Sequence, residues 1–196
     1  MKKKIVGLFV CMLLITTILP MTAMAGDEKN PEIKDKIGDM FKHVDIVSVW
    51  FHEDDNNPDY LYVSFKVRDL IDRTQMFEAI YVVDWVFNGN TYAADAHVFP
   101  TGVSVFTSGK TIVNGHGIIR YESYVICKSI FDVDTNIMTW IIPKTAIGNP
   151  HHGDLLTKLF ASTALRFPLS TNLPHWDLFK DLSWNAWYRN DYTIQI

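Results

Sequence analysis

The feature that most constrains the fold of this chain is the strict two-residue alternation along residues 60–67. One set of side chains in this segment is apolar and comprises Leu61, Val63, Phe65 and Val67, and the other comprises Tyr60, Tyr62, Ser64 and Lys66. Successive side chains of a β-strand point to opposite faces of the sheet. The alternation therefore predicts a strand with one buried side.

Further strands are predicted along most of the chain. The segments with strand-like composition are residues 44–51, 78–87, 91–99, 102–106, 118–127 and 137–142, with a closing strand at 192–196. Turn-forming residues separate them, such as Asn88-Gly89-Asn90 between two alternating runs. Many short strands at this spacing predict a mainly all-β fold, an antiparallel, jelly-roll-like β-sandwich.

Two segments have helical spacing instead, so we expect one or two short helices in addition. Pro31 precedes apolar residues at positions 33, 37, 40 and 41, as it would at the start of a helix. Asp154 is placed to cap a second helix, whose apolar stripe would comprise Leu155, Leu156, Leu159, Phe160 and Leu165. We expect the second helix to lie over the sandwich.

The N-terminus has the three-part layout of a cleavable secretory signal. Three lysines at positions 2–4 precede an uncharged apolar run over residues 5–19, and Ala23-Met24-Ala25 precedes Gly26. The run is shorter than the roughly 20 residues that span a bilayer, although an uncleaved anchor is the alternative. We therefore divide the chain into a signal peptide at 1–25, an N-terminal linker or short helix at 26–43 and a β-sandwich domain at 44–196. A secreted, extracellular or cell-surface location is expected.

Charge and cysteine content narrow the function classes. Loss of the three signal lysines lowers Lys and Arg from 18 to 15 against 22 Asp and Glu, so the net charge falls from −4 to −7. A nucleic-acid partner is not expected, because phosphate binding needs a clustered basic surface. Cys127 alone remains after cleavage, so no disulfide is expected within the domain. A buried thiol is predicted, with an intermolecular disulfide as the alternative.

A calcium loop is one candidate site. Asp55, Asn57 and Asp59 place oxygen side chains at alternate positions, and Ca²⁺ prefers oxygen ligands. The positions of Tyr60 and Lys66 exclude the helix-loop-helix version. The alternative is an ordinary polar turn between two strands. No other cofactor is expected.

A transition-metal site and a hydrolase are the weaker candidates. His151 and His152 could join Asp95 and His97, which share one face of a predicted strand, or could simply belong to a polar loop. The chain has no G-x-S-x-G elbow, no H-E-x-x-H sequence and no glycine-rich phosphate loop. An enzyme is therefore a minor expectation, and no catalytic residue is assigned.

Aromatic residues supply the ligand-binding candidates. Tyr60 and Tyr62 lie on the strand face opposite the apolar set, where flat rings beside Asp and Asn suit the stacking of a sugar ring. Three tryptophans of the C-terminal tail offer a second platform: Trp176, Trp184 and Trp187. The alternative is that these rings are packing residues, because large aromatics mostly cover a core.

The order of the strands resembles that of a known group of domains. Residues 45–51 and 59–67, with Ile141-Ile142-Pro143-Lys144 and Arg189-Asn190-Asp191-Tyr192, look like secreted prokaryotic β-sandwich domains. Those are similar to the family 9 carbohydrate-binding and DOMON-like sandwiches. The resemblance rests on strand pattern over residues 44–196 and carries no site residue across. It implies a jelly-roll-like sandwich with a binding or surface role.

Together these features predict a secreted or cell-surface binding module for glycan or another extracellular polymer. One alternative is a structural or protein-interaction domain of the cell envelope without a small ligand. The other is an uncharacterised hydrolase. The partner expected is an extracellular glycan or an envelope protein, with membrane contact only through an uncleaved signal segment.

Overall fold

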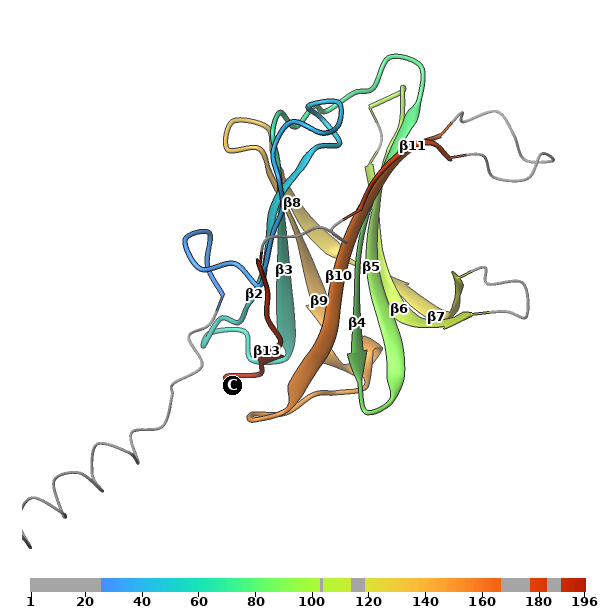
Figure 1. The fold of residues 1–196 in the computed structure, drawn as a ribbon. Coiled ribbons are helices and arrows are strands. Elements are labelled where there is room, and N and C mark those ends of the chain that lie inside the picture. Colours follow the sequence, from blue (N-terminus) through green and yellow to red (C-terminus); the bar gives the residue numbers. More distant parts are fainter. Residues whose placement is uncertain (1–25, 103, 114–118, 167–176, 183–187) are drawn as a thin grey trace, which may run out of the picture.

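The computed structural model describes residues 26–102, 104–113, 119–166, 177–182 and 188–196, and these form two antiparallel sheets packed on each other (Figure 1). The strands of the first sheet, sheet A, are β1 (Ile33–Lys34), β2 (Ile46–His52), β3 (Tyr60–Val67), β8 (Lys128–Asp132), β9 (Ile137–Pro143) and β12 (Tyr188–Arg189). The strands of the second, sheet B, are β4 (Glu78–Phe87), β5 (Asn90–Val98), β6 (Ser104–Val113), β7 (Ile119–Ile126), β10 (Leu155–Arg166), β11 (Asp177–Leu182) and β13 (Tyr192–Thr193).

The topology confirms the predicted all-β sandwich. Sheet A has the order β12-β1-β2-β3-β9-β8, and sheet B has the order β11-β10-β4-β5-β6-β7, with β13 paired to β10. The chain builds β1–β3 in sheet A, β4–β7 in sheet B, β8 and β9 in sheet A, and β10 and β11 in sheet B. Each sheet is thus assembled from separate stretches of sequence, so residues far apart in the chain share one sheet face.

The core lies between the sheets and follows the two-residue alternation. In β3 the predicted apolar set is completely buried: Leu61, Val63, Phe65 and Val67. Trp85 of β4 and Trp140 of β9 are the largest side chains in the core, and both have no exposed surface. Each Å² of apolar surface that is buried stabilises the folded state by about 25 cal/mol. Packing of these large side chains is therefore the main source of stability.

The helix predicted after Asp154 is wrong, because the segment forms the twelve-residue strand β10. The register with β4 shifts between Thr157 and Phe160, and Lys158 there has a positive φ of 54°. Such a bulge inserts one residue into the alternation. The buried positions Leu156 and Leu159 are therefore three apart, which resembles helical spacing, while the strand beyond them returns to a period of two.

The short helix predicted within residues 26–43 is also absent from the structure. Ile33 and Lys34 form strand β1, which pairs with β2 and β12, and Gly38 has a positive φ of 100°. Ile33 is buried, whereas Ile37 and Phe41 are 57% and 51% exposed, so these apolar residues do not form one buried stripe. Isolated helices this short are marginal in water, and pairing at the sheet edge satisfies the backbone instead.

One short helical turn is present among the described residues, at a place not predicted. It is the 3₁₀ helix η1 (Lys144–Ile147), which follows β9. Lys144 lies almost completely buried beside Glu53, with 2.6 Å between Nζ and Oε1, and its Nζ also donates to the main-chain oxygen of Ile196. Glu53 accepts hydrogen bonds from the Tyr192 hydroxyl and from the Gln195 backbone. This ion pair fixes residues 192–196 against the sandwich.

Candidate functional site

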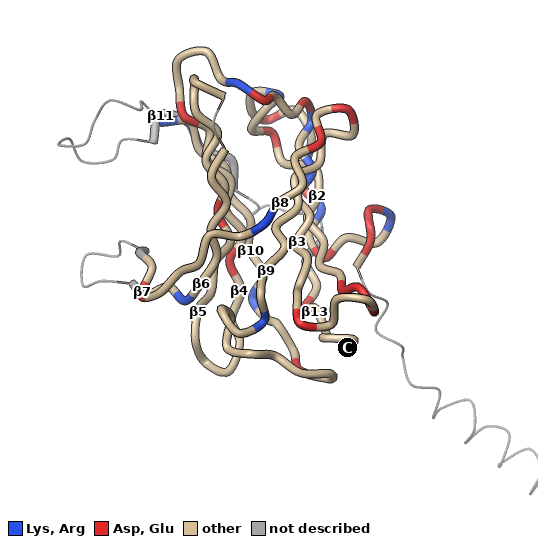
Figure 2. The backbone as a smooth tube through the Cα atoms, turned by 180° about the vertical axis from the view of Figure 1, so that it is seen from behind, with Lys and Arg blue, Asp and Glu red and all other residues tan. Residues whose placement is uncertain are grey.

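The outer face of sheet B carries a group of polar side chains that extends from the middle of the sheet to one end of its strands. Charged residues elsewhere lie mostly in loops near the ends of the strands (Figure 2). The group, named here the sheet B cluster, consists of Glu78, Asp84, Asp95, His97, Thr107, Tyr121 and Arg166. It draws on β4, β5, β6, β7 and β10, so five strands position it.

Strand alternation directs these side chains outward. In β5 the positions Tyr92, Ala94, Ala96 and Val98 pack into the core. Asp95 and His97 lie between them and therefore face away from the core. The same alternation in β4 buries Tyr81, Val83 and Trp85 and turns Asp84 outward. Register then sets the neighbours, because His97 lies opposite Ile80 and Asp84 lies opposite Ala93.

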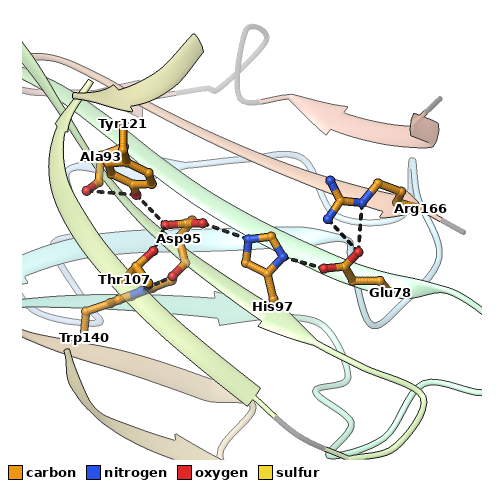
Figure 3. Close-up of polar contacts among 8 residues, drawn as sticks. All are labelled: Glu78, Ala93, Asp95, His97, Thr107, Tyr121, Trp140 and Arg166. Atoms are coloured by element: carbon orange, nitrogen blue, oxygen red, sulfur yellow. Dashed lines mark hydrogen bonds and ion pairs between the residues drawn. The ribbon is translucent and has the colours of Figure 1, made fainter. Parts of the chain in front are cut away.

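His97 connects two carboxylates. Its Nδ1 is 2.5 Å from Oε1 of Glu78, and its Nε2 is 2.8 Å from Oδ2 of Asp95. Arg166 approaches the other oxygen of Glu78 at 2.8 Å from Nε and 2.7 Å from a terminal nitrogen. Figure 3 shows these four side chains as one continuous chain of contacts across the sheet.

The opposite charges along this series of contacts stabilise one another. Burial alone would lower the pKa of His97, but the hydrogen bonds to Asp95 and Glu78 outweigh it and raise that pKa to about 9. Burial opposes ionisation of both carboxyls, yet His97 and their other donors hold the pKa values of Asp95 and Glu78 below the usual range. At neutral pH the imidazolium therefore lies between two carboxylates.

Asp95 is held by donors on every side. Its Oδ1 accepts hydrogen bonds from the hydroxyls of Thr107 and Tyr121. Its backbone oxygen accepts one from Nε1 of Trp140, which reaches through the core from sheet A at 2.9 Å. Such a fully bonded carboxylate is rigidly oriented.

Tyr121 reaches Asp95 because β7 turns toward the outer face of sheet B. The turn depends on Gly109 of β6, where a Cβ would come within 2.0 Å of the Ser123 oxygen and 2.7 Å of the Tyr124 Cα. With no side chain at this position, the backbone of β7 passes directly over β6. The Tyr121 hydroxyl thereby crosses β6 and also approaches the backbone oxygen of Ala93 on β5.

Asp84 is the exception within the cluster, because one of its two carboxyl oxygens has no hydrogen-bond donor in the described part of the chain. Its Oδ1 is completely buried and has no hydrogen-bond partner among the described residues. Burial, together with the negative charge of Asp95, raises the pKa of Asp84 to about 7. The cluster thus contains two bonded carboxylates, Asp95 and Glu78, and next to Asp95 one carboxyl that is partly protonated at neutral pH.

The predicted aromatic sites have a different location. Tyr60 and Tyr62 lie half-buried on the outer face of sheet A, and Tyr62 stacks on His52 with ring centroids 5.0 Å apart. The structure therefore brings Tyr62 together with a histidine that the sequence reasoning did not select. Trp176, Trp184 and Trp187 lie outside the described residues.

The predicted metal ligands lie in the loop between β2 and β3. Asp55, Asn57 and Asp59 are all exposed there. The Asn57 side chain donates to Oδ2 of Asp54 at 2.8 Å, as in a polar turn. Among the described residues, no group of three or more His, Cys, Asp or Glu side chains is arranged to hold a metal ion. Calcium binding by this loop stays a prediction.

The histidines proposed for a second metal site are not brought together with Asp95 and His97. Both ring nitrogens of His97 face carboxylates, while Nδ1 of His152 lies 2.5 Å from the Gln195 backbone oxygen. Cys127 is buried and free, as predicted, and burial followed by the charge of Asp95 raises its pKa to about 12. The thiol is therefore unreactive at neutral pH.

Sequence reasoning found Asp95 and His97 but missed their partners. A usable signal existed within β4, where Asp84 interrupts the apolar run of residues 79–87 at a position of the outer face. Glu78, Tyr121 and Arg166 carry no such signal, because their relation to His97 and Asp95 depends on strand order.

The comparisons with known proteins find no relative of this chain. No protein-family model matches the chain, and neither the curated proteins nor the solved structures give a significant match. The resemblance to carbohydrate-binding and DOMON-like sandwiches therefore stays a prediction. In the part of the chain that the structure describes, no helix has the length and hydropathy needed to cross a membrane.

Proposed function

We propose that this protein is a secreted or cell-surface binding module for glycan or another extracellular polymer, and that the sheet B cluster is its binding surface. The observation that carries the proposal is the buried Oδ1 of Asp84, which lacks a hydrogen-bond partner among the described residues. Buried polar atoms are nearly always paired. An acceptor left open beside rigidly bonded groups suits a ligand that donates a hydrogen bond there.

The surrounding chemistry suits a polyhydroxylated ligand. Carboxylates accept strong hydrogen bonds from hydroxyl groups, and the guanidinium of Arg166 is a donor in a fixed geometry. Asp95 and His97 are 14% and 23% exposed, so they are accessible but already oriented. Groups ordered before binding lose less conformational entropy on binding. The export signal at residues 1–25 supports an extracellular location for this binding.

Tyr60 and Tyr62 offer a competing surface on the opposite side of the sandwich. Both rings are half-buried, and Tyr62 already stacks on His52. They therefore suit stacking on a sugar ring less well than a row of fully exposed rings would. The two surfaces belong to different sheets, so one substitution on each surface can show which of them binds the ligand.

The test is retention of the purified protein on a panel of immobilised polysaccharides, with two variants. Asp84→Leu removes the acceptor while keeping the branched shape and heavy-atom count of the side chain, and Tyr62→Ala removes the ring on sheet A. We expect Asp84→Leu to lose retention and Tyr62→Ala to keep it. The reverse pattern would move the site to sheet A. Absence of retention for the unmodified protein would leave the structural or protein-interaction domain.

A hydrolase is the second candidate, on one specific observation. The pKa of Asp84 is raised and that of neighbouring Asp95 is lowered, and a pair of carboxyls with opposite shifts can divide acid and base roles. Release of soluble sugar from a retained polysaccharide, lost in Asp84→Leu, would favour this candidate. Retention without release would favour the binding module.

A further inference from the structure

The neighbours of Asp84 show which kind of group is missing beside it. In the sheet register it lies between Phe160 of β10 and Ala93 of β5, and neither side chain donates a hydrogen bond. The Tyr121 hydroxyl, on the overlying strand β7, donates to Asp95 instead. The open Oδ1 therefore needs a donor that none of these three side chains supplies.

The local charge shows that the missing donor is more than a hydroxyl group. Asp95 is the charged residue whose field acts on Asp84, and it is ionised. The two cations of the cluster are already engaged, His97 between Asp95 and Glu78 and Arg166 on Glu78. A neutral hydroxyl would satisfy Oδ1 but would leave the charge of Asp84 uncompensated, since both cations are already paired with Asp95 and Glu78. A cation would do both.

Among organic cations, the geometry favours a primary ammonium. An ammonium is compact and has three donors, so it needs less room than a guanidinium to reach the buried Oδ1 of Asp84. We propose that the ligand of the sheet B cluster is a glycan with free primary amino groups, bound through an ammonium that donates to Asp84 beside Asp95. This inference rests on the proposed function and specifies its ligand class.

The proton balance of this contact is simple. An amine that arrives protonated meets the ionised form of Asp84. An amine that arrives neutral takes the proton of the Asp84 carboxyl. Both routes end in the same ammonium–carboxylate pair, and no bond to carbon is made or broken.

The experiment compares three sugar tetramers that differ at one substituent: β-1,4-linked glucosamine, its N-acetylated form, and β-1,4-linked glucose. Binding of each to the purified protein is measured by isothermal titration calorimetry at pH 7. We expect the glucosamine tetramer to bind roughly 10-fold to 100-fold more tightly than the other two, as a charge-assisted hydrogen bond implies.

Two matched variants locate the effect. Asp84→Asn keeps the size of the side chain but removes its charge, and we expect it to abolish the preference for the amine. Asp134→Asn makes the same change at an exposed turn residue and should leave the preference intact. Thermal melting keeps the result interpretable: loss of an unpaired buried carboxyl should not lower the melting temperature of Asp84→Asn, so loss of binding would not mean unfolding.

The outcomes separate this inference from the function on which it rests. Equal binding of all three tetramers, or an amine preference that persists in Asp84→Asn, would overturn the amino-glycan ligand and keep the glycan-binding module. Binding of no tetramer and of no polysaccharide in the panel would overturn both.

Discussion

The imidazolium of His97 should make the stability of this protein fall as the pH rises from 7 to 9. The folded state raises the pKa of His97 from the model-peptide value of 6.5 to about 9, because Asp95 and Glu78 bond to the charged ring. Between those values the folded protein holds a proton that the unfolded chain has lost, so the free energy of unfolding decreases by about 1.4 kcal/mol per pH unit. The stabilisation is complete below pH 6.5 and is lost as the pH passes 9.

The magnitude over this interval is roughly 3 kcal/mol, which corresponds to a fall in melting temperature of about 10 °C for a domain of this size. Other buried groups titrate in a different window. Glu32 and Asp84 have pKa values raised to about 7, so their stabilisation is present below pH 4, is lost mostly between pH 4 and 7 and is gone by about pH 8. The slope between pH 8 and 9 therefore reports on His97.

The assay is urea denaturation at half-unit pH steps from 6 to 10, for the unmodified protein, for His97→Gln and for His151→Gln. Glutamine at position 97 has no titrating ring, so the fall between pH 8 and 9 should disappear. His151 is exposed, and its replacement should leave the curve unchanged. A flat curve for the unmodified protein, or the same slope in His97→Gln, would refute the charged bridge between the two carboxylates.

Three further predictions concern other parts of the sandwich. Gly109→Ala should destabilise the protein by roughly 1–3 kcal/mol in urea denaturation, because the new Cβ would meet the Ser123 oxygen at 2.0 Å; an unchanged midpoint would show that β7 moves freely. Lys144→Met should lower the free energy of unfolding by about 3–5 kcal/mol, since Glu53 would remain buried without a countercharge, and adding Glu53→Gln should restore part of it; no recovery in the double variant would argue against the ion pair. If the loop between β2 and β3 binds calcium, the melting temperature should rise when calcium is added, and no rise at millimolar calcium would remove that hypothesis.

The fold class was predictable because alternation is a local property. The side chains of Tyr60–Val67 carry the period of a half-buried strand whatever lies next to them, and the structure buries the apolar set completely. The same reasoning failed in β10, where the bulge near Lys158 changes the spacing of buried residues from two to three. A bulge is a relation between two strands, so one strand's sequence cannot distinguish it from a helical turn.

The candidate site was only partly predictable, for a related reason. Asp95 and His97 share a face because they are two residues apart in one strand, and this spacing is visible in the sequence. Glu78 and Arg166 are distant in sequence, and Glu78 meets both His97 and Arg166 because β4 lies between β5 and β10. The role of Gly109 depends equally on β7 passing over β6, which no local pattern indicates.

The sequence by itself determined the period of each strand, and through it which side chains face the core and which face outward. It also carries the N-terminal pattern from which an export signal is predicted, and the acidic balance of the chain. Tertiary structure decided which outward side chains meet, because strand order and register bring together residues that the chain keeps apart. The charge on His97 and the open carboxyl of Asp84 belong to this second level, since burial and neighbouring charges set a pKa only after the sheets have assembled.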